Sequence, residues 1–244
     1  MNSQSSQPGM MEDPDRPPPQ GAFPVWSRVF TKPGEGTFVE ITEHPDASAK
    51  NAYIWVFIAG TFSGLINSLV QFVVGLAGLR QTMPEFDQLP GFTVGLGVGG
   101  LLGAICTAPL TGLFSVIGFA IGVALIHWVA RFLGGQGTFD KLSYAMAAIT
   151  APVTLISAFL IPINAIPYAS FCTLPVFFLL GLYVIYLNIT AAKSVHRFGW
   201  LEAIIAVFLP AIMIGFLCAF LFLGAMRMLG PSINDMLRQM QQGL

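Results

Sequence analysis

A glycine run in the middle of the chain is the pattern that most directly suggests chemistry. Gly95, Gly97 and Gly100 form G-x-G-x-x-G, the spacing that lets a dinucleotide phosphate approach the backbone. That chemistry also requires a β-strand before the glycines, a helix that starts at them and an acidic residue about 20 positions later. The preceding stretch MPEFDQLPGF contains two prolines, and no acidic residue follows at that distance. No nucleotide cofactor is therefore predicted.

The other residue types that perform chemistry are scattered. His44, His127 and His196 lack metal-ligand spacing, and the three cysteines occur in apolar runs without a C-x-x-C pair. His127 lies beside Trp128 near the end of an apolar stretch, where an interface-anchored ring is expected rather than a ligand. Metalloprotease, Walker A and nucleophile-elbow motifs do not occur. We predict neither an enzyme nor a bound metal or other cofactor.

The elements that position these residues are expected to be membrane spans. Only 9% of the 244 residues are charged and the mean hydropathy is +0.72, whereas soluble domains contain about 25% charged residues. No Asp, Glu, Lys or Arg occurs in residues 51–79, 88–130, 142–192 or 203–226. A bilayer explains this partition, because a charge at mid-depth costs about 2.5–3.5 kcal/mol. The net charge of −1 gives no indication of a nucleic-acid partner.

The fold class that follows is an all-α, polytopic transmembrane bundle of five spans in residues 51–230. Each span needs about 20 apolar residues. The expected spans are 53–79, 99–132, 144–161, 172–190 and 203–229. Two alternatives stay open for residues 92–103, which are either a re-entrant piece or part of the second span.

The distribution of basic residues predicts the orientation. An N-terminus in the cytoplasm places eight of the eleven basic residues on the cytoplasmic side, as the positive-inside rule requires. Five spans then place the C-terminus on the opposite side. Outside the bundle we expect a disordered polar tail in residues 1–22, cytoplasmic helices in residues 23–50 and a short polar tail in residues 231–244.

The segment FPVWSRVFTKP predicts a short amphipathic helix, with Val25, Trp26, Val29 and Phe30 at helical spacing. Such a helix either lies in the membrane interface or packs on the cytoplasmic ends of the chain's own spans. Thr37-x-x-Glu40 matches a capping box and predicts a second short helix with Phe38 and Ile41 on one face.

Small residues at four-residue spacing indicate how the spans associate. Helices in lipid lack a hydrophobic drive toward one another, so small side chains that permit close backbone approach hold them together. The residues predicted to pack helices are Gly60, Gly64, Gly99, Gly103, Gly118 and Gly122.

Three stretches of the sequence resemble a known family. Residues 133–162 contain Gly134-Gly135, Gly137, Phe139, Lys141 and a span with Pro152. Residues 191–210 combine a basic, His-containing loop with an acidic residue and Pro210, and residues 26–45 form a third match. Over residues 26–229 the chain is similar to the Yip family of Ypt/Rab-interacting five-span membrane proteins, in particular its bacterial members.

The resemblance implies a cytoplasmic N-terminal segment and five spans. Eukaryotic relatives act in vesicle trafficking, bind prenylated Rab GTPases and shape membranes. The N-terminal segment here lacks their Asp-Leu-Tyr-Gly-Pro signature, which argues against a small-GTPase partner. The resemblance implies a plasma-membrane location for a bacterial member and an endoplasmic reticulum or Golgi location for a eukaryotic one.

The function predicted from these observations is membrane organisation, scaffolding or a trafficking-like role, by helix packing and a basic cytoplasmic face. The expected partners are the lipid bilayer and either other membrane proteins or a second copy of the chain. The residues expected to contact lipid or partner are Trp26, Arg28, Lys193, His196 and Arg197. The alternative is a small-solute or ion transporter or channel. Its candidate polar groups are the amides of Asn67 and Gln71, one turn apart in the first span, and of Asn164 in the turn between the third and fourth spans.

Overall fold

The fold is given by a computed structural model, which describes residues 21–82, 92–164, 166 and 168–242. These residues form seven helices and no strand. Helices α1 (Ala22–Thr31) and α2 (Glu35–Glu43) are short, and the other five are long. The long helices are α3 (Ala49–Thr82), α4 (Phe92–Phe132), α5 (Phe139–Asn164), α6 (Ala169–His196) and α7 (Trp200–Gln242).

Five helices are long and apolar enough to cross a membrane, which confirms the predicted five-span, all-α bundle. The apolar spans are Ala49–Gly78, Val98–Phe132, Phe139–Asn164, Phe171–His196 and Trp200–Gly224. Helix α4 runs without interruption from Phe92, so residues 92–103 belong to the helix of the second span and form no separate re-entrant piece. Helix α5 begins earlier than expected because the Thr138 hydroxyl accepts the backbone N–H of Lys141 (3.4 Å) at its first turn.

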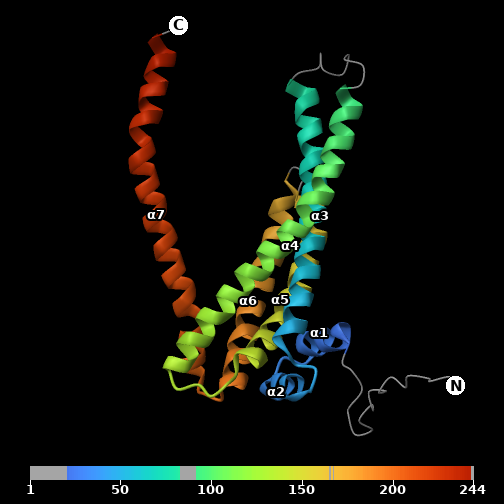
Figure 1. Cartoon of the computed structure of the whole chain (residues 1–244), viewed down its shortest axis with the longest axis vertical. Helices are drawn as coiled ribbons and strands as arrows, with labels where there is room; N and C mark the ends of the chain where they lie inside the picture. Colours follow the sequence, from blue (N-terminus) through green and yellow to red (C-terminus); the bar gives the residue numbers. More distant parts are fainter. Residues whose placement is uncertain (1–20, 83–91, 165, 167, 243–244) are drawn as a thin grey trace, which may run out of the picture.

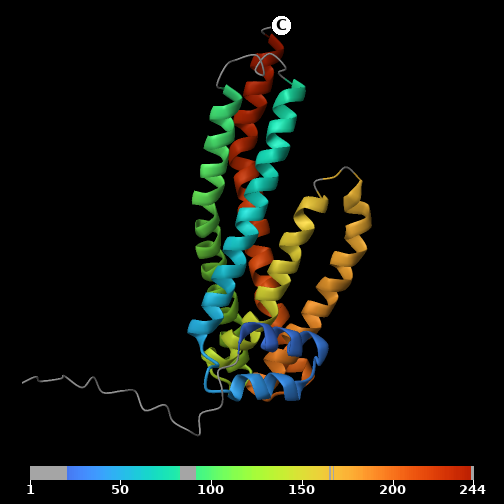
Figure 2. The same cartoon turned by 90° about the vertical axis from the view of Figure 1, so that its right-hand side faces the viewer.

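The helices form two hairpins, a cap and one outlying helix. Helices α3 and α4 form a long antiparallel pair, and α5 and α6 form a shorter one that stops well below the far ends of α3 and α4 (Figure 2). Helices α1 and α2 lie across one end of the bundle (Figure 1). This end, with the loops 133–138 and 197–199, is called the capped end. Helix α7 starts at the capped end and then leans away from the other spans (Figure 1).

The tightly packed core lies at the capped end. Every residue of α5 from Leu142 to Ile149 is buried there. The Tyr144 ring lies 4.9 Å from that of Trp55 in α3. Farther from this end, large apolar side chains such as Phe178 in α6 and Phe216 in α7 are exposed. A bilayer is a favourable environment for such side chains, because lipid tails are as apolar as leucine.

Candidate functional site

The N-terminal helices are seated on the spans by an apolar contact. Val25 and Val29 of α1 lie one helical turn apart on a single face, and both are at most 2% exposed. Phe38 and Ile41 of α2 are fully buried in the same core. The Tyr183 hydroxyl of α6 donates to the carbonyl oxygen of Phe30 at 2.8 Å. Of the two alternatives for α1, the structure shows packing on the chain's own span ends.

The predicted capping box at Thr37 is wrong. Helix α2 begins at Glu35, before Thr37, and its N-cap residue Gly34 makes no side-chain cap bond. The Thr37 hydroxyl donates instead to the carbonyl oxygen of Lys32 at 2.8 Å, which ties α2 to the end of α1. The Thr37 hydroxyl thus bonds to a nearby backbone carbonyl instead of capping the helix, as Ser and Thr side chains often do.

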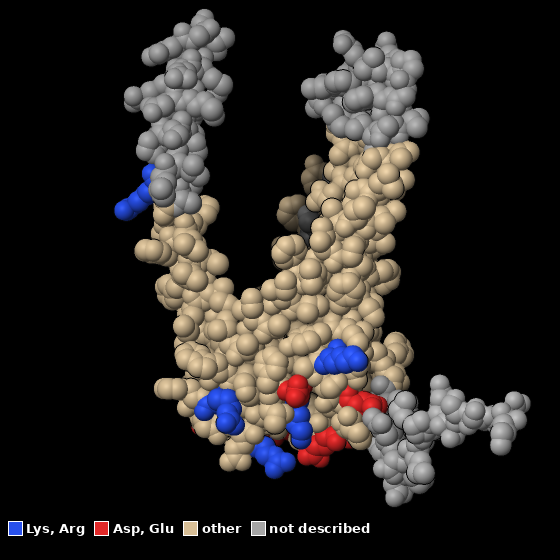
Figure 3. Space-filling view, viewed as in Figure 1, with Lys and Arg blue, Asp and Glu red and all other residues tan. Residues whose placement is uncertain are grey.

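Charged side chains gather at the capped end (Figure 3). Glu35 of α2 pairs with Lys193 of α6, and Glu43 approaches Arg197 with 3.6 Å between Oε1 and Nη2. Arg28 pairs with Glu40, which links α1 to α2. The pairs at Lys193 and Arg197 join α2 to the end of α6, beside the apolar contact.

Of the residues predicted to contact lipid or partner, Lys193 and His196 are engaged inside the protein. The Lys193 ammonium lies 4.3 Å from the centroid of the Trp200 ring as well as against Glu35, and its side chain is only 15% exposed. His196 is 1% exposed. Trp26 is half-buried, edge-on to Trp55 with ring centroids 5.8 Å apart. The Arg197 side chain, in contrast, is 73% exposed.

A pair of histidines joins α4 to the end of α6. His196 Nε2 lies 3.2 Å from His127 Nδ1, and the His196 ring stacks on Phe198 with centroids 5.5 Å apart. Gly135 passes so close to this ring that a Cβ there would lie 2.7 Å from His196 Cδ2. The sequence gives no signal for this pair, because its two members are 69 positions apart on different helices.

A small polar pocket opens next to the histidines. Its volume is about 180 Å³. Its lining residues are Gln136, Gly137, Thr138, Lys141, Val195 and Arg197.

The pocket forms because the loop between α4 and α5 folds against the end of α6. The Gln136 N–H donates to the carbonyl oxygen of His196 at 3.3 Å. A Cβ on Gly137 would lie 2.6 Å from the carbonyl oxygen of Val195, so this approach requires glycine. Arg197 follows α6 in the left-handed conformation (φ 55°) and its N–H donates to the carbonyl oxygen of Lys193 at 2.8 Å. The turn brings Arg197 and Lys141 together in the lining of one pocket.

The predicted packing glycines separate into two groups. A Cβ on Gly60 would lie 2.6 Å from Ser115 Oγ, and a Cβ on Gly64 would lie 2.6 Å from Thr111 Cβ, so α3 and α4 approach closely there. At Gly99, Gly103, Gly118 and Gly122 a Cβ would meet nothing within 4 Å. These four glycines do not pack α4 against another described helix of this chain. A packing role for them needs a neighbour outside the chain and stays a prediction.

On α4, a second stripe one residue further along the chain than Gly99 and Gly103 also contacts α3, beside Thr111 and Ser115. Gly100 meets Phe72, Gly112 meets Thr61 and the carbonyl oxygen of Phe57, and Ala104 and Ala108 between them are buried. Sequence reasoning missed this stripe because small residues recur every four positions in both registers. The hydroxyls of Ser68 and Thr107 add a hydrogen bond of 3.3 Å across the same contact.

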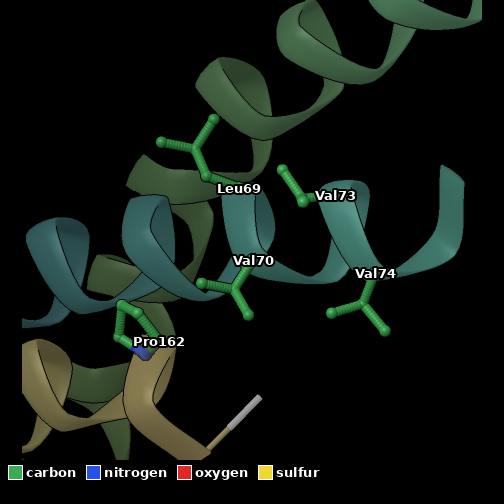
Figure 4. A pocket seen from close by; sticks show the side chains of 5 residues that line it. All are labelled: Leu69, Val70, Val73, Val74 and Pro162. Atoms are coloured by element: carbon green, nitrogen blue, oxygen red, sulfur yellow. The ribbon is translucent and has the colours of Figure 1, made fainter. Parts of the chain in front are cut away.

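The two described pockets among the spans are apolar. One, of about 250 Å³, lies where Pro162 of α5 meets Leu69, Val70, Val73 and Val74 of α3 (Figure 4). The other, of about 350 Å³, lies between α4 and α7 and includes Trp128 and Pro210 among its lining residues. Asn67 and Gln71 are exposed and line neither of these pockets. Within the described residues no three His, Cys, Asp or Glu side chains gather as a metal site.

Comparison with known proteins adds a family match. A family model described as the Yip1 domain matches residues 27–223. Comparison with curated proteins and with solved structures finds no match. The matched segment includes half of α1, all of α2 to α6 and nearly all of the spanning part of α7.

Proposed function

The chain belongs to the Yip1 family of membrane proteins, and we propose that it is a non-enzymatic membrane scaffold. In this proposal the spans fix the protein in the bilayer, and the capped end organises lipids or partner proteins at the membrane surface. We propose further that the capped end faces the cytoplasm, because most basic residues of the chain lie on that side.

One observation carries the proposal: at the capped end, α1 and α2 are held in a fixed position on the spans. Four apolar side chains of α1 and α2 are almost fully buried against the spans. Ion pairs to Lys193 and Arg197 and a hydrogen bond from Tyr183 surround that contact. Apolar, ionic and hydrogen-bonding contacts hold this segment, so its outer face has a fixed geometry. A fixed surface favours recognition, because it loses little conformational entropy when a partner binds.

A transporter or channel is the alternative, and the described interior gives it little support. A solute path through a bundle is expected to be lined by polar groups that face inward. The contact between α3 and α4 is instead closed by Gly60, Gly64 and Gly112, and the neighbouring pocket at Pro162 is apolar (Figure 4). Asn67 and Gln71 are exposed rather than enclosed in the α3–α4 contact.

The test asks whether binding of partners or lipids depends on the docked position of α1. Val29→Asp places a charge in the fully buried seat of α1, whereas Ser27→Asp places the same charge at an exposed position of the same helix. Each variant is purified from native membranes, and the proteins and lipids that come with it are identified by mass spectrometry. The proposal expects Val29→Asp to lose a specific set of companions that the unmodified chain and Ser27→Asp retain.

Two outcomes would count against the scaffold. One is that Val29→Asp, with its cap shown by protease sensitivity to be undocked, keeps the same companions as the unmodified chain. The other is that the unmodified protein, reconstituted in sealed vesicles, carries a solute flux that Val29→Asp leaves intact.

A further inference from the structure

We propose that the polar pocket at Lys141 and Arg197 binds a phosphate group, supplied by the headgroup of an anionic phospholipid. The inference rests on the proposed function, because it names the lipid chemistry that the capped end would recognise. The lipid contact is assigned to Lys141 and Arg197 rather than to Lys193 and His196, because the last two are engaged inside the protein.

The lining of the pocket supplies hydrogen-bond donors for an anion. Lys141 and Arg197 are among the lining residues, and ammonium and guanidinium groups are the side-chain groups that bind phosphate most strongly in proteins. Gln136 contributes an amide and Thr138 a hydroxyl. Within the described part of the chain, Lys141 makes no ion pair.

Two carboxylates near the pocket limit its charge without cancelling it. Asp140 neighbours Lys141 in sequence but is exposed and is not part of the lining. Glu43 lies 3.6 Å from the Arg197 guanidinium, and both side chains are more than half exposed. Exposed pairs of this kind are weak, and a guanidinium has five donors, so Arg197 keeps donors for a second acceptor.

The position of the pocket favours a lipid as the source of the phosphate. Its residues lie where three apolar spans begin or end, at Phe132, Phe139 and His196. That level corresponds to the boundary between hydrocarbon and headgroups. The exposed aromatic side chains of Trp128 and Trp200 lie near the same span ends, as expected for residues anchored at the interface.

The size of the pocket fits a headgroup rather than a whole lipid. Pockets for drug-sized molecules measure about 300–1,000 Å³, and this one measures about 180 Å³. A phosphate group therefore occupies the pocket while the acyl chains remain in the bilayer.

The experiment compares matched charge removals in the full-length protein. Lys141→Gln, Arg197→Gln and the double variant each remove pocket cations. Lys50→Gln removes an exposed cation at the start of α3, outside the pocket. Each protein is titrated in detergent with phosphatidylglycerol and with phosphatidylcholine of identical acyl chains, and bound lipid is counted by native mass spectrometry.

The expected result is a loss of phosphatidylglycerol affinity of about fivefold for each pocket cation removed, as for basic groups at a membrane surface. Lys50→Gln is expected to stay within about twofold of the unmodified chain, because Lys50 does not line the pocket and makes no direct contact with the bound phosphate. Weak phosphatidylcholine binding is expected to be equal in all variants. Equal losses for Lys50→Gln and Lys141→Gln, or unchanged affinity in the double variant, would overturn the proposal.

A second variant guards against misfolding. Gln136 is exposed, so Gln136→Glu places a repulsive charge in the pocket without disturbing the core, and it is expected to weaken phosphatidylglycerol binding. All variants are compared by size-exclusion profile. Normal phosphatidylglycerol affinity in a well-folded Gln136→Glu protein would contradict the site.

Soluble phosphate distinguishes the two possible sources. Inorganic phosphate and glycerol 3-phosphate are added as competitors, and a lipid site expects them to displace phosphatidylglycerol poorly. If inorganic phosphate binds alone and displaces the lipid, the phosphate site stands and the lipid source is wrong. If the pocket variants bind lipid normally while Val29→Asp still loses its companions, this inference fails and the scaffold proposal survives.

Discussion

At the scale of single residues, the side chains that matter most are the smallest ones. Gly60, Gly64 and Gly112 permit the contact between α3 and α4, whereas Gly99, Gly103, Gly118 and Gly122 of α4 meet nothing within 4 Å. The difference follows from helix geometry. With 3.6 residues per turn, each four-residue step drifts by about 40° around the helix. Gly99 therefore points about 160° away from Ser115, although both belong to one four-residue series.

A pair of substitutions tests this division. Gly64→Leu is expected to destabilise the protein by about 1–3 kcal/mol, because the added side chain collides with Thr111 in the neighbouring helix. Gly118→Leu makes the same chemical change where a Cβ meets nothing within 4 Å. The midpoint of thermal unfolding in detergent is the measurement. Equal midpoints for the two variants would remove the packing argument.

At the scale of elements, the attachment of α2 to α6 is the contact most open to test. Lys193→Glu brings two carboxylates together at Glu35 and loses the contact with the Trp200 ring. Because the Glu35 side chain is 50% exposed, the expected cost is about 1 kcal/mol or less. That cost corresponds to amide hydrogen exchange in α2 that is faster by up to about fivefold.

The charge-swapped protein supplies the control for this prediction. Lys193→Glu combined with Glu35→Lys restores opposite charges and is expected to return most of the protection of α2. Lys50→Glu, at an exposed position away from the pair, is expected to leave α2 unchanged. A double variant that exchanges as fast as Lys193→Glu alone would show that the pair does not hold the cap.

Sequence reasoning works well for some elements and poorly for others. The spans are predictable because a charge inside a bilayer is costly, so uncharged stretches mark the helices. The seat of α1 is not predictable, because Val25 and Val29 suit a lipid surface and a protein surface equally well. The polar pocket is also hidden, since Lys141 and Arg197 meet only when the loop at Gly137 folds against Val195.

At the scale of the whole molecule, the five apolar spans among the described residues lead us to expect the two ends of the chain on opposite sides of the membrane. We expect the capped end in the cytoplasm. The test uses a protein in which Cys106, Cys172 and Cys218 are replaced by alanine, with one new cysteine at Ser27 or at Gln242. An impermeant maleimide is expected to label Gln242→Cys in intact cells and Ser27→Cys only after the membrane is opened. Labelling of Ser27→Cys in intact cells would reverse the orientation.

The seat of the cap also has a consequence for biosynthesis. Phe30 and its partner Tyr183 are 153 positions apart, and ribosomes add about 5–20 residues per second, so roughly 8–30 s pass before the partner exists. Until α5 has been synthesised, the apolar face of α1, with Val25 and Val29, lacks the span that later covers most of it. A helix with this pattern can rest on the nearby bilayer until the later spans arrive. The amphipathic character of α1 thus has a use while the chain is still growing, before the helix reaches its final buried position.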